Sequence, residues 1–541
     1  MAEIGMERPT AQSSATPQVG DVCAVSRLSD YSEGARASAA QVIPQPRPVP
    51  GTGATAAVRR VLEDAWWYTW ARGAQGGTAL VASIALSHIL QPDQYGLYAV
   101  AMAVSTLGGT ILFNWISSSA FRFYAEAEAD GTHGVLMAAS VWALVLSTAA
   151  TIVVLAVAVV VTLVLDSALS IRLLVPIAGV AITEAVLTLY KSVLMARREV
   201  RTLSGLVAVE CLLRWGGAIG AAVVAAPRTD LLLYGQLTGT ALLAVALAVR
   251  SARALTGAML QHPPWEYVRR MFVFGAPLAG SSLSSWVISV SDRILLAGLA
   301  GSTAAGVYAA GYQIGSNIVL LPASVLMAGA YPVLLQEYGT VGRDAASRML
   351  STLTSAAVVA GTAVVVAIVS AAPLLASVLG PAFRQSSGII PLIAGAQLLA
   401  VITEYYAKSF QLTNRTGRLF QVSALAAVVS VVANLALVPW MRMYGSAAAT
   451  LIASGAALTL TVRWGRPLLP FDLERTLALK VGAAAAVSIA AARLLPPVVD
   501  VASLRALATL IPMLAFGACL VAARENTTIA ALRFCTGRQP R

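Results

Sequence analysis

The chain has 541 residues, 58% of them hydrophobic and 11% charged, with a formal net charge of +12 and a mean hydropathy of +0.76. Soluble domains carry about 25% charged residues, so this composition excludes a string of ordinary soluble domains. Apolar runs of about 20 residues, long enough to cross a bilayer as helices, recur from Trp66 almost to the C-terminus. We therefore predict an all-α polytopic membrane protein, since helices satisfy their own backbone hydrogen bonds in hydrocarbon.

The N-terminal region is a different class of sequence. It lacks apolar periodicity and includes the proline-rich stretch PQPRPVPGTGATAA (44–57), so we predict a disordered tail over residues 1–60. No basic stretch followed by an apolar segment opens the chain, and we expect no cleavable signal peptide. The cysteines are scattered without metal-ligand spacing, which predicts neither a disulfide nor a metal site. We expect no cofactor, no catalytic residues and no nucleic-acid partner.

The apolar runs predict about fourteen transmembrane helices joined by short connections. Their expected ranges are 66–87, 96–118, 135–162, 172–193, 203–226, 231–249, 271–291, 304–328, 353–378, 388–410, 419–438, 444–462, 476–494 and 503–522. Lys and Arg are concentrated in the even-numbered connections, for example in RREVR (197–201) between the fourth and fifth helices. Because positive residues favour the cytoplasmic side, we predict that both termini are cytoplasmic.

Two parts of the sequence resemble each other. VRRVLEDAWWYTW begins at residue 58 and VRRMFVFGAPLAG at residue 268, and each precedes an apolar span, a short polar link and a Gly-x-Tyr-Ala sequence that begins at Gly96 or Gly306. The fourth and tenth predicted helices also share an Ile-Thr-Glu sequence, which ends at Glu184 and Glu404. We therefore expect the chain to contain two equivalent halves.

This repeat predicts two six-helix bundles in the same orientation, followed by two additional helices. The expected boundaries are a cytoplasmic tail at 1–60, an N-terminal bundle at 61–260, a C-terminal bundle at 261–465, two extra transmembrane helices at 466–525 and a cytoplasmic tail at 526–541. In many transporters the substrate site lies at the interface between such repeats.

Two of the predicted helices carry polar residues along one face. Glu184, Thr188 and Lys191 share a face of the fourth helix, and Glu404 and Lys408 share a face of the tenth. A charge at the bilayer centre costs roughly 2.5–3.5 kcal/mol on insertion scales. We therefore expect these faces to contact protein or water rather than lipid.

Simpler interpretations of the same charges stay open. Glu404–Lys408 and Glu210–Arg214 have i, i+4 spacing, which suits ion pairs within a single helix. Lys191 and Lys408 lie near predicted helix ends, where a lysine side chain can extend to the membrane interface.

Four stretches resemble a known family: LQPDQYGLYAVAMAV (90–104), SAFRFYAE (119–126), SDRILLAGLAGSTAAGVYAAGYQI (291–314) and YPVLLQEY (331–338). By these sequences the chain resembles the polysaccharide transporter family, the Wzx-type lipid-linked oligosaccharide flippases, within the superfamily of MATE exporters and lipid II flippases. The resemblance implies two bundles around a cavity that opens alternately to each side of a bacterial cytoplasmic membrane. It also implies a polyprenyl-diphosphate-linked glycan as substrate, H⁺ or Na⁺ as coupling ion, and polysaccharide polymerase machinery as a further partner.

A diphosphate that crosses a low-dielectric layer needs fixed cations, and the forked donors of arginine match phosphate oxygens. The candidate substrate-binding residues are Arg72, Gln75, Arg122, Lys191, Arg214, Arg293 and Lys408. The candidate ion-coupling residues are Glu184, Asp292 and Glu404, because a desolvated carboxylate can be made to titrate. Asp292 and Arg293 are alternatively a structural element near the end of the seventh helix.

Two other functions are considered. A MATE-like, ion-coupled exporter of small cationic molecules would present a net acidic cavity and would lack the two terminal helices. An integral-membrane glycan polymerase or glycosyltransferase would carry a long extracytoplasmic loop with clustered carboxylates or histidines. The 3 histidines of this chain are scattered, and the apolar runs leave no such loop. We therefore expect a transporter and not an enzyme.

Overall fold

The computed structural model describes residues 54–164, 171–259, 265–413, 415–471, 475–494 and 510–522. The chain separates into two units, Met1–Arg60 and Val61–Arg541, and the helical bundle lies in the second. Most of the predicted N-terminal tail, the whole predicted C-terminal tail and the first part of the fourteenth predicted helix lie outside the described residues.

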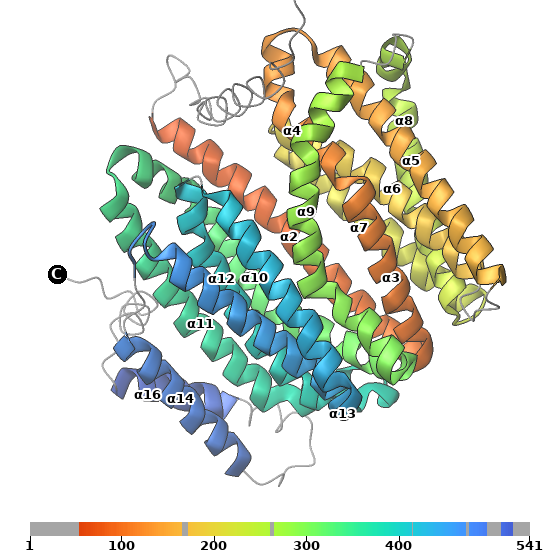
Figure 1. The fold of residues 1–541 in the computed structure, drawn as a ribbon. Helices are drawn as coiled ribbons and strands as arrows, with labels where there is room; N and C mark the ends of the chain where they lie inside the picture. The colour runs from red at the N-terminus through yellow and green to blue at the C-terminus, as the bar shows by residue number, and fades with distance from the viewer. Residues whose placement is uncertain are drawn as a thin grey trace, which may run out of the picture. The chain divides into compact units, whose positions relative to one another are not determined.

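The described residues form helices and contain no strand (Figure 1). The elements are α2 (Ala54–Ile89), α3 (Pro92–Leu112), α4 (Asn114–Ala129), α5 (His133–Val164), α6 (Ile171–Ala196), α7 (Val200–Val224), α8 (Thr229–Met259), α9 (Trp265–Ala300), α10 (Ser302–Thr340), α11 (Arg343–Val378), the 3₁₀-helix η1 (Pro381–Gly388), α12 (Ile389–Leu412), α13 (Thr416–Gly465), α14 (Arg475–Leu494) and α16 (Leu510–Ala522). Within the described ranges, 9 segments are long and apolar enough to cross a membrane. The prediction of an all-α polytopic membrane protein is confirmed.

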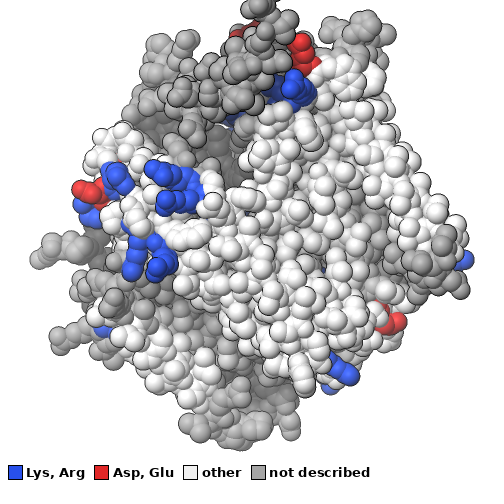
Figure 2. Space-filling model, in the orientation of Figure 1, with Lys and Arg blue, Asp and Glu red and all other residues white. Residues whose placement is uncertain are grey.

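The surface of the bundle also suits a bilayer. The side of α5 that faces away from the other helices exposes valines, among them Val153, Val157 and Val160. Figure 2 shows a broad face of the described residues on which charged side chains gather toward the margins of the view. Since apolar side chains on this scale are unfavourable in water, we assign the face to lipid.

The second predicted helix differs from expectation, because it is broken in the middle. A single helix was expected at 96–118, whereas α3 ends at Leu112 and α4 begins at Asn114. Phe113 lies between them with φ −124° and ψ −26°. Gly108 and Gly109 precede the break, and neighbouring glycines weaken a helix and favour a kink.

α13 contains both the eleventh and the twelfth predicted helices. A straight helix of its 50 residues would be about 75 Å long, more than twice the thickness of a bilayer core. Arg442 breaks it with φ 49° and ψ −126°, and Pro439 lies just before the break. The two arms fold against each other, since the Ser446 hydroxyl donates a hydrogen bond to Asn434 Oδ1 at 2.9 Å. Two spans therefore arise here, as the sequence predicted.

Equivalent helices of the two predicted halves meet at equivalent glycines. α3 packs against α10, and Gly96 of α3 lies against the backbone of Ser302 and Gly306. Gly306 in turn lies against the backbone of Pro92 and Gly96. The backbones of the two helices approach so closely that no space remains for a side chain at either glycine. Small residues permit such close approach in membrane helix pairs.

Helices of the two predicted halves also exchange hydrogen bonds elsewhere. Asn114 of α4 donates to the Ser282 hydroxyl of α9 at 2.7 Å, and the Ser119 hydroxyl donates to the Met271 carbonyl at 2.7 Å. Asn317 of α10 donates to the Gly76 carbonyl of α2 at 3.3 Å. The first helix of each predicted half thus contacts the second helix of the other half.

The two C-terminal helices pack on α11. Leu477 and Val481 of α14 and Phe516 of α16 are buried with Val358 and Val366 of α11. Both helices lie beside α11 at the lower left of Figure 1. They are therefore additions to one side of the bundle.

Candidate functional site

The helices form two cavities, and five of the candidate residues line them. The first has a volume of about 230 Å³, and we call it the two-arginine cavity after Arg214 and Arg293. The second has a volume of about 400 Å³, and we call it the hydroxyl-lined cavity after the serines and threonine in its wall. It contains Arg72, Gln75 and Lys191. The structure therefore brings these candidates together in two groups.

The two-arginine cavity is formed by helices of both predicted halves. Its lining residues come from α2, α3, α7, α8, α9 and α10: Ala79, Ser83, Leu86, Tyr95, Tyr98, Ala99, Met102, Ala103, Thr106, Arg214, Trp215, Gln236, Val290, Arg293, Ala309 and Gln313. This wall contains two arginines and no carboxylate. A ligand here meets a positive, mostly apolar surface.

Two buried hydrogen-bond donors of cavity-lining residues have no acceptor among the described residues. Gln236 is fully buried, and its Oε1 accepts a hydrogen bond from the Tyr98 hydroxyl at 3.1 Å. Its Nε2 is buried and donates to no described group. Arg214 Nε is likewise buried and donates to no described group. A buried donor without an acceptor costs about 1–3 kcal/mol, so these groups favour a ligand that accepts hydrogen bonds.

Arg293 is held at the cavity by an aromatic ring. Its guanidinium lies 4.5 Å from the centre of the Tyr312 ring, and its Nη1 donates to the Ser289 carbonyl at 3.2 Å. A cation over an aromatic face is stabilised by about 0.5–2 kcal/mol, depending on how far it is desolvated. Arg293 therefore forms no ion pair within contact distance among the described residues, although the neighbouring Asp292 carboxylate interacts electrostatically with its guanidinium.

Asp292 occupies a different environment from its neighbour. It is 1% exposed and lines neither cavity. It accepts hydrogen bonds from the Tyr308 hydroxyl at 2.5 Å and from the Arg293 amide at 2.8 Å, and Tyr308 also contacts Thr450 at 3.1 Å. This buried network favours the structural role that we considered for Asp292.

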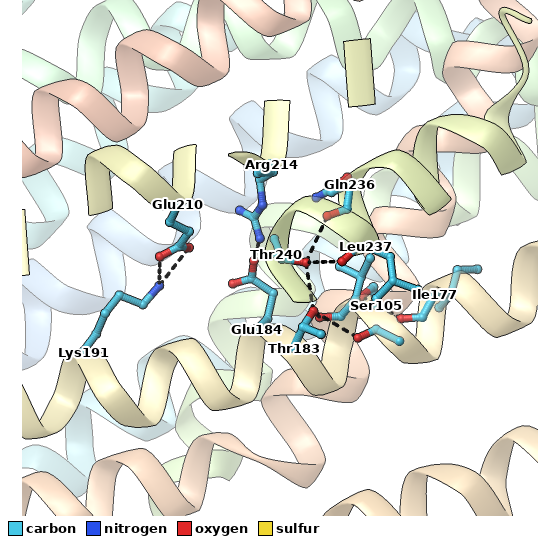
Figure 3. A network of polar contacts seen from close by, with 12 residues as sticks. Ser105, Ile177, Thr183, Glu184, Lys191, Glu210, Arg214, Gln236, Leu237 and Thr240 are labelled. Carbon is cyan, nitrogen blue, oxygen red and sulfur yellow. Dashed lines mark hydrogen bonds and ion pairs between the residues drawn. The ribbon is translucent and has the colours of Figure 1, made fainter. Parts of the chain in front are cut away.

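Two ion pairs connect α6 with α7, as Figure 3 shows. Arg214 Nη2 contacts Glu184 Oε1, and this ion pair is the only polar contact of that oxygen among the described residues. Lys191 Nζ lies 3.0 Å from both carboxylate oxygens of Glu210. The intrahelical Glu210–Arg214 pair suggested by the i, i+4 spacing does not form in the described structure, because both residues pair with α6 instead.

The polar face of α6 contacts other helices along much of its length. The Thr183 hydroxyl lies 3.0 Å from the Thr240 hydroxyl of α8, and the Ser105 hydroxyl of α3 donates to the Ile177 carbonyl at 3.1 Å. Figure 3 shows these contacts in line with the two ion pairs. Glu184 and Lys191 therefore face protein, as the cost of charge in lipid requires.

The hydroxyl-lined cavity lies beside Lys191. Its wall consists of Ala71, Arg72, Gln75, Ser117, Ser118, Phe121, Thr188, Lys191, Ser192, Met195, Leu203 and Val207. Arg72 and Gln75 are exposed at the cavity, whereas the charge of Lys191 is matched by Glu210. This wall offers a cation, an amide, several hydroxyls and an aromatic ring.

The remaining candidates line neither cavity. Lys408 is 7% exposed, with its Nζ 4.8 Å from the centre of the Tyr331 ring and 3.5 Å from Glu404. This contact is the intrahelical pair considered from the sequence. The Glu404 side chain is 54% exposed, and Arg122 is exposed with its guanidinium 5.8 Å from the Phe123 ring centre. Glu404 therefore has a different environment from its repeat equivalent, Glu184.

Tyr98 and Gln236, which share a hydrogen bond at the two-arginine cavity, are not among the residues predicted from the sequence. Tyr98 was considered only as part of the Gly-x-Tyr-Ala repeat, and Gln236 was not considered at all. Gln236 is the one amide in the predicted sixth span, 231–249. A single amide in an apolar span is a signal that could have identified it.

Comparison with known proteins identifies the family to which the chain belongs. A family model described as "Polysaccharide biosynthesis protein" matches residues 61–337, about half of the chain. The chain belongs to the polysaccharide biosynthesis protein family. No curated protein matches the chain. The recognition of a polysaccharide transporter from the sequence is thereby confirmed.

Several solved structures share the fold of this polysaccharide biosynthesis protein. The lipid II flippase MurJ, in an inward closed conformation, gives a TM-score of 0.66 at 11% identity, over 86% of this chain and 99% of that one. An inward-facing multidrug resistance MATE family transporter of the MOP superfamily gives 0.56 at 15% identity, over 73% and 94%. The MATE multidrug transporter DinF-BH gives 0.54 at 12% identity, over 79% and 100%. At these identities the likeness establishes the fold.

Proposed function

We propose that the protein flips a polyprenyl-diphosphate-linked oligosaccharide from the cytoplasmic to the outer leaflet by alternating access. Its family acts in polysaccharide biosynthesis, and its fold is shared by a lipid II flippase. The observation that carries the proposal is the two-arginine cavity, a positive site in an apolar bundle and lined from both predicted halves. The related folds belong to transporters, which supports a transporter rather than an enzyme.

The cavity's chemistry suits the diphosphate of such a substrate. The cavity holds two guanidinium groups, and buried donors of Arg214 and Gln236 have no acceptor in the described part of the chain. These groups match a diphosphate, whose oxygens accept hydrogen bonds. A volume of about 230 Å³ accommodates a diphosphate but not an oligosaccharide. The hydroxyl-lined cavity, with its amide and Phe121, offers hydrogen bonds and an apolar ring face to a sugar. We assign the diphosphate to the first cavity and part of the glycan to the second.

Transport against a gradient would require coupling to H⁺ or Na⁺. Among the three candidate carboxylates, Glu184 lies next to a cavity-lining cation, Asp292 belongs to a buried network, and Glu404 pairs with Lys408. Glu184 is therefore the carboxylate that we assign to coupling.

A MATE-like exporter of organic cations is the second candidate function. Multidrug transporters of the MATE family share the fold, and this likeness is the observation that favours it. The two-arginine cavity argues against it, because its wall holds two arginines and no carboxylate, and the Glu184 carboxylate that faces Arg214 is already engaged in an ion pair.

Reconstitution tests these two functions against each other. Proteoliposomes that contain the purified protein are expected to move a fluorescent polyprenyl-diphosphate-linked oligosaccharide to the opposite leaflet, where an impermeant quencher reaches it. Protein-free vesicles are the control. Transport of an organic cation without movement of the lipid-linked glycan would replace the flippase by the exporter.

We further propose that the protein lies in the cytoplasmic membrane of a bacterium with both termini cytoplasmic. In a chain whose natural cysteines are replaced by serine, cysteines at the exposed positions Thr132 and Asp344 are expected to be protected from an impermeant thiol reagent in intact cells. Cysteines at Thr303 and Arg384, also exposed, are expected to react. Labelling of Asp344→Cys from outside would contradict this topology.

A further inference from the structure

The Arg214 guanidinium is available to two different partners. It lines the two-arginine cavity, and it also forms the ion pair with Glu184 on α6. Its side chain is 19% exposed and that of Glu184 is 25% exposed, so both groups have little water to replace a lost partner. An anion in the cavity and the Glu184 carboxylate therefore compete for the same guanidinium group.

Glu184 also lies next to the other cavity. Thr188, one helical turn further along α6, lines the hydroxyl-lined cavity. Arg214 contacts Glu184 from the side of the two-arginine cavity. The ion pair thus stands between the two cavities, and its opening changes the charge presented to each of them.

Arg214 has a second donor that no described group engages. The Nε donor is buried without an acceptor among the described residues, while Nη2 is engaged by Glu184. An anion that takes the place of Glu184 can engage both donors, since a guanidinium holds an oxyanion best through two parallel hydrogen bonds. Gln236 Nε2, which also lacks a described acceptor, lines the same cavity.

We propose that a diphosphate anion entering the two-arginine cavity displaces Glu184 from Arg214, and that the displaced carboxylate takes up a proton. This inference rests on the proposed function and specifies how substrate binding is coupled to a cation. In a poorly solvated site, a carboxylate that has lost its cation partner binds a proton more readily. The proton comes from the solvent, and it returns there when Glu184 pairs with Arg214 again.

The groups around Glu184 allow this exchange. From α7 it faces Arg214 and, one turn away, Glu210, whose charge is matched by Lys191. From α8 the polar groups are the uncharged Gln236 and Thr240. On α3 the titratable group that interacts electrostatically with Arg214 is Tyr98, which donates to Gln236. Tyr124 of α4 and His133 of α5 are in contact with each other near Arg197, about 20 Å further along the axis of α6.

The test measures diphosphate binding and proton uptake in the full-length protein in lipid nanodiscs. Inorganic diphosphate is titrated calorimetrically in buffers with different ionisation enthalpies, so that the number of protons taken up is obtained with the affinity. The wild-type protein is expected to take up more protons than Glu184→Gln does. Because the competing charge is removed, Glu184→Gln is expected to bind diphosphate about tenfold more tightly. Protonation of diphosphate itself is common to both proteins and cancels in the comparison.

Glu210→Gln is the matched control, since it breaks the other ion pair between the same two helices. It is expected to keep the proton uptake of the wild type. Glu184→Asp, which retains the charge, is expected to retain proton uptake as well and provides a second variant if Glu184→Gln folds poorly. Equal affinity and equal proton uptake in wild type and Glu184→Gln would overturn the exchange. If the wild-type protein still flips the lipid-linked glycan, that result leaves the proposed function intact.

Discussion

Substitution of Arg214 by glutamine is expected to lower glycan export at least tenfold and to destabilise the protein at the same time. Export falls because a charge-assisted hydrogen bond to the substrate contributes about 1.5–3 kcal/mol, which corresponds to roughly 10- to 100-fold. Stability falls because Glu184 is left as a partly buried carboxylate without its cation, a change that costs about 3–5 kcal/mol for a fully buried pair and less at 25% exposure. The measurements are the initial rate of flipping in proteoliposomes and the apparent Tm of the detergent-solubilised protein.

The double variant Arg214→Gln/Glu184→Gln separates these two effects. With both charges removed, no carboxylate is left unpaired, so the apparent Tm is expected to return toward that of the wild type. Export is expected to stay low, because the cavity has lost one of its two arginines. A double variant that exports at the wild-type rate would show that Arg214 acts only through the stability of the ion pair.

Arg228→Gln supplies the control for a general effect of removing an arginine. Arg228 is exposed in its pair with Asp230, at 53% of its side-chain surface, and lines neither cavity. Exposed ion pairs contribute about 0–1 kcal/mol. Export and stability are expected to change little.

The helices of this chain were largely predictable because their signal is local. An apolar run of about 20 residues identifies a spanning helix without reference to the rest of the molecule. The hairpin in α13 was found in this way, since the sequence at 439–443 interrupts two such runs. The break at Phe113 was missed, because Gly108 and Gly109 also occur in unbroken helices and their effect depends on packing.

The candidate site was predictable by residue type but not by partner. Helical spacing places Glu210 and Arg214 on the same face of α7, which suggested that they pair with each other. The structure pairs both with α6, because the rotation of one helix against its neighbour determines which charges meet. This rotation is set by contacts between helices that are distant in sequence. It therefore could not be predicted from the local pattern of one sequence.

The repeat shows the same limit. The sequence identified Gly96 and Gly306 as equivalent positions, and it predicted a site between the two halves. It did not indicate that these glycines contact each other's helices, which is the contact that joins α3 to α10. Symmetry-related contacts of this kind become visible only when both helices are placed.

Gly96→Ala and Gly306→Ala are each expected to destabilise the protein by about 3 kcal/mol or more, and to similar extents. A Cβ at Gly96 would collide with the carbonyl oxygen of Ser302, and a Cβ at Gly306 would collide with that of Pro92. Backbone atoms cannot move aside as a flexible side chain does, so the two helices must separate along their contact. Forced overpacking of this kind typically costs about 1–3 kcal/mol and occasionally more. The apparent Tm and the yield of monodisperse protein measure the effect.

Gly298→Ala is the control, since a Cβ there meets no described atom within 4 Å, and it is expected to leave both quantities unchanged. A Gly96→Ala protein as stable as the control would contradict the close crossing of α3 and α10.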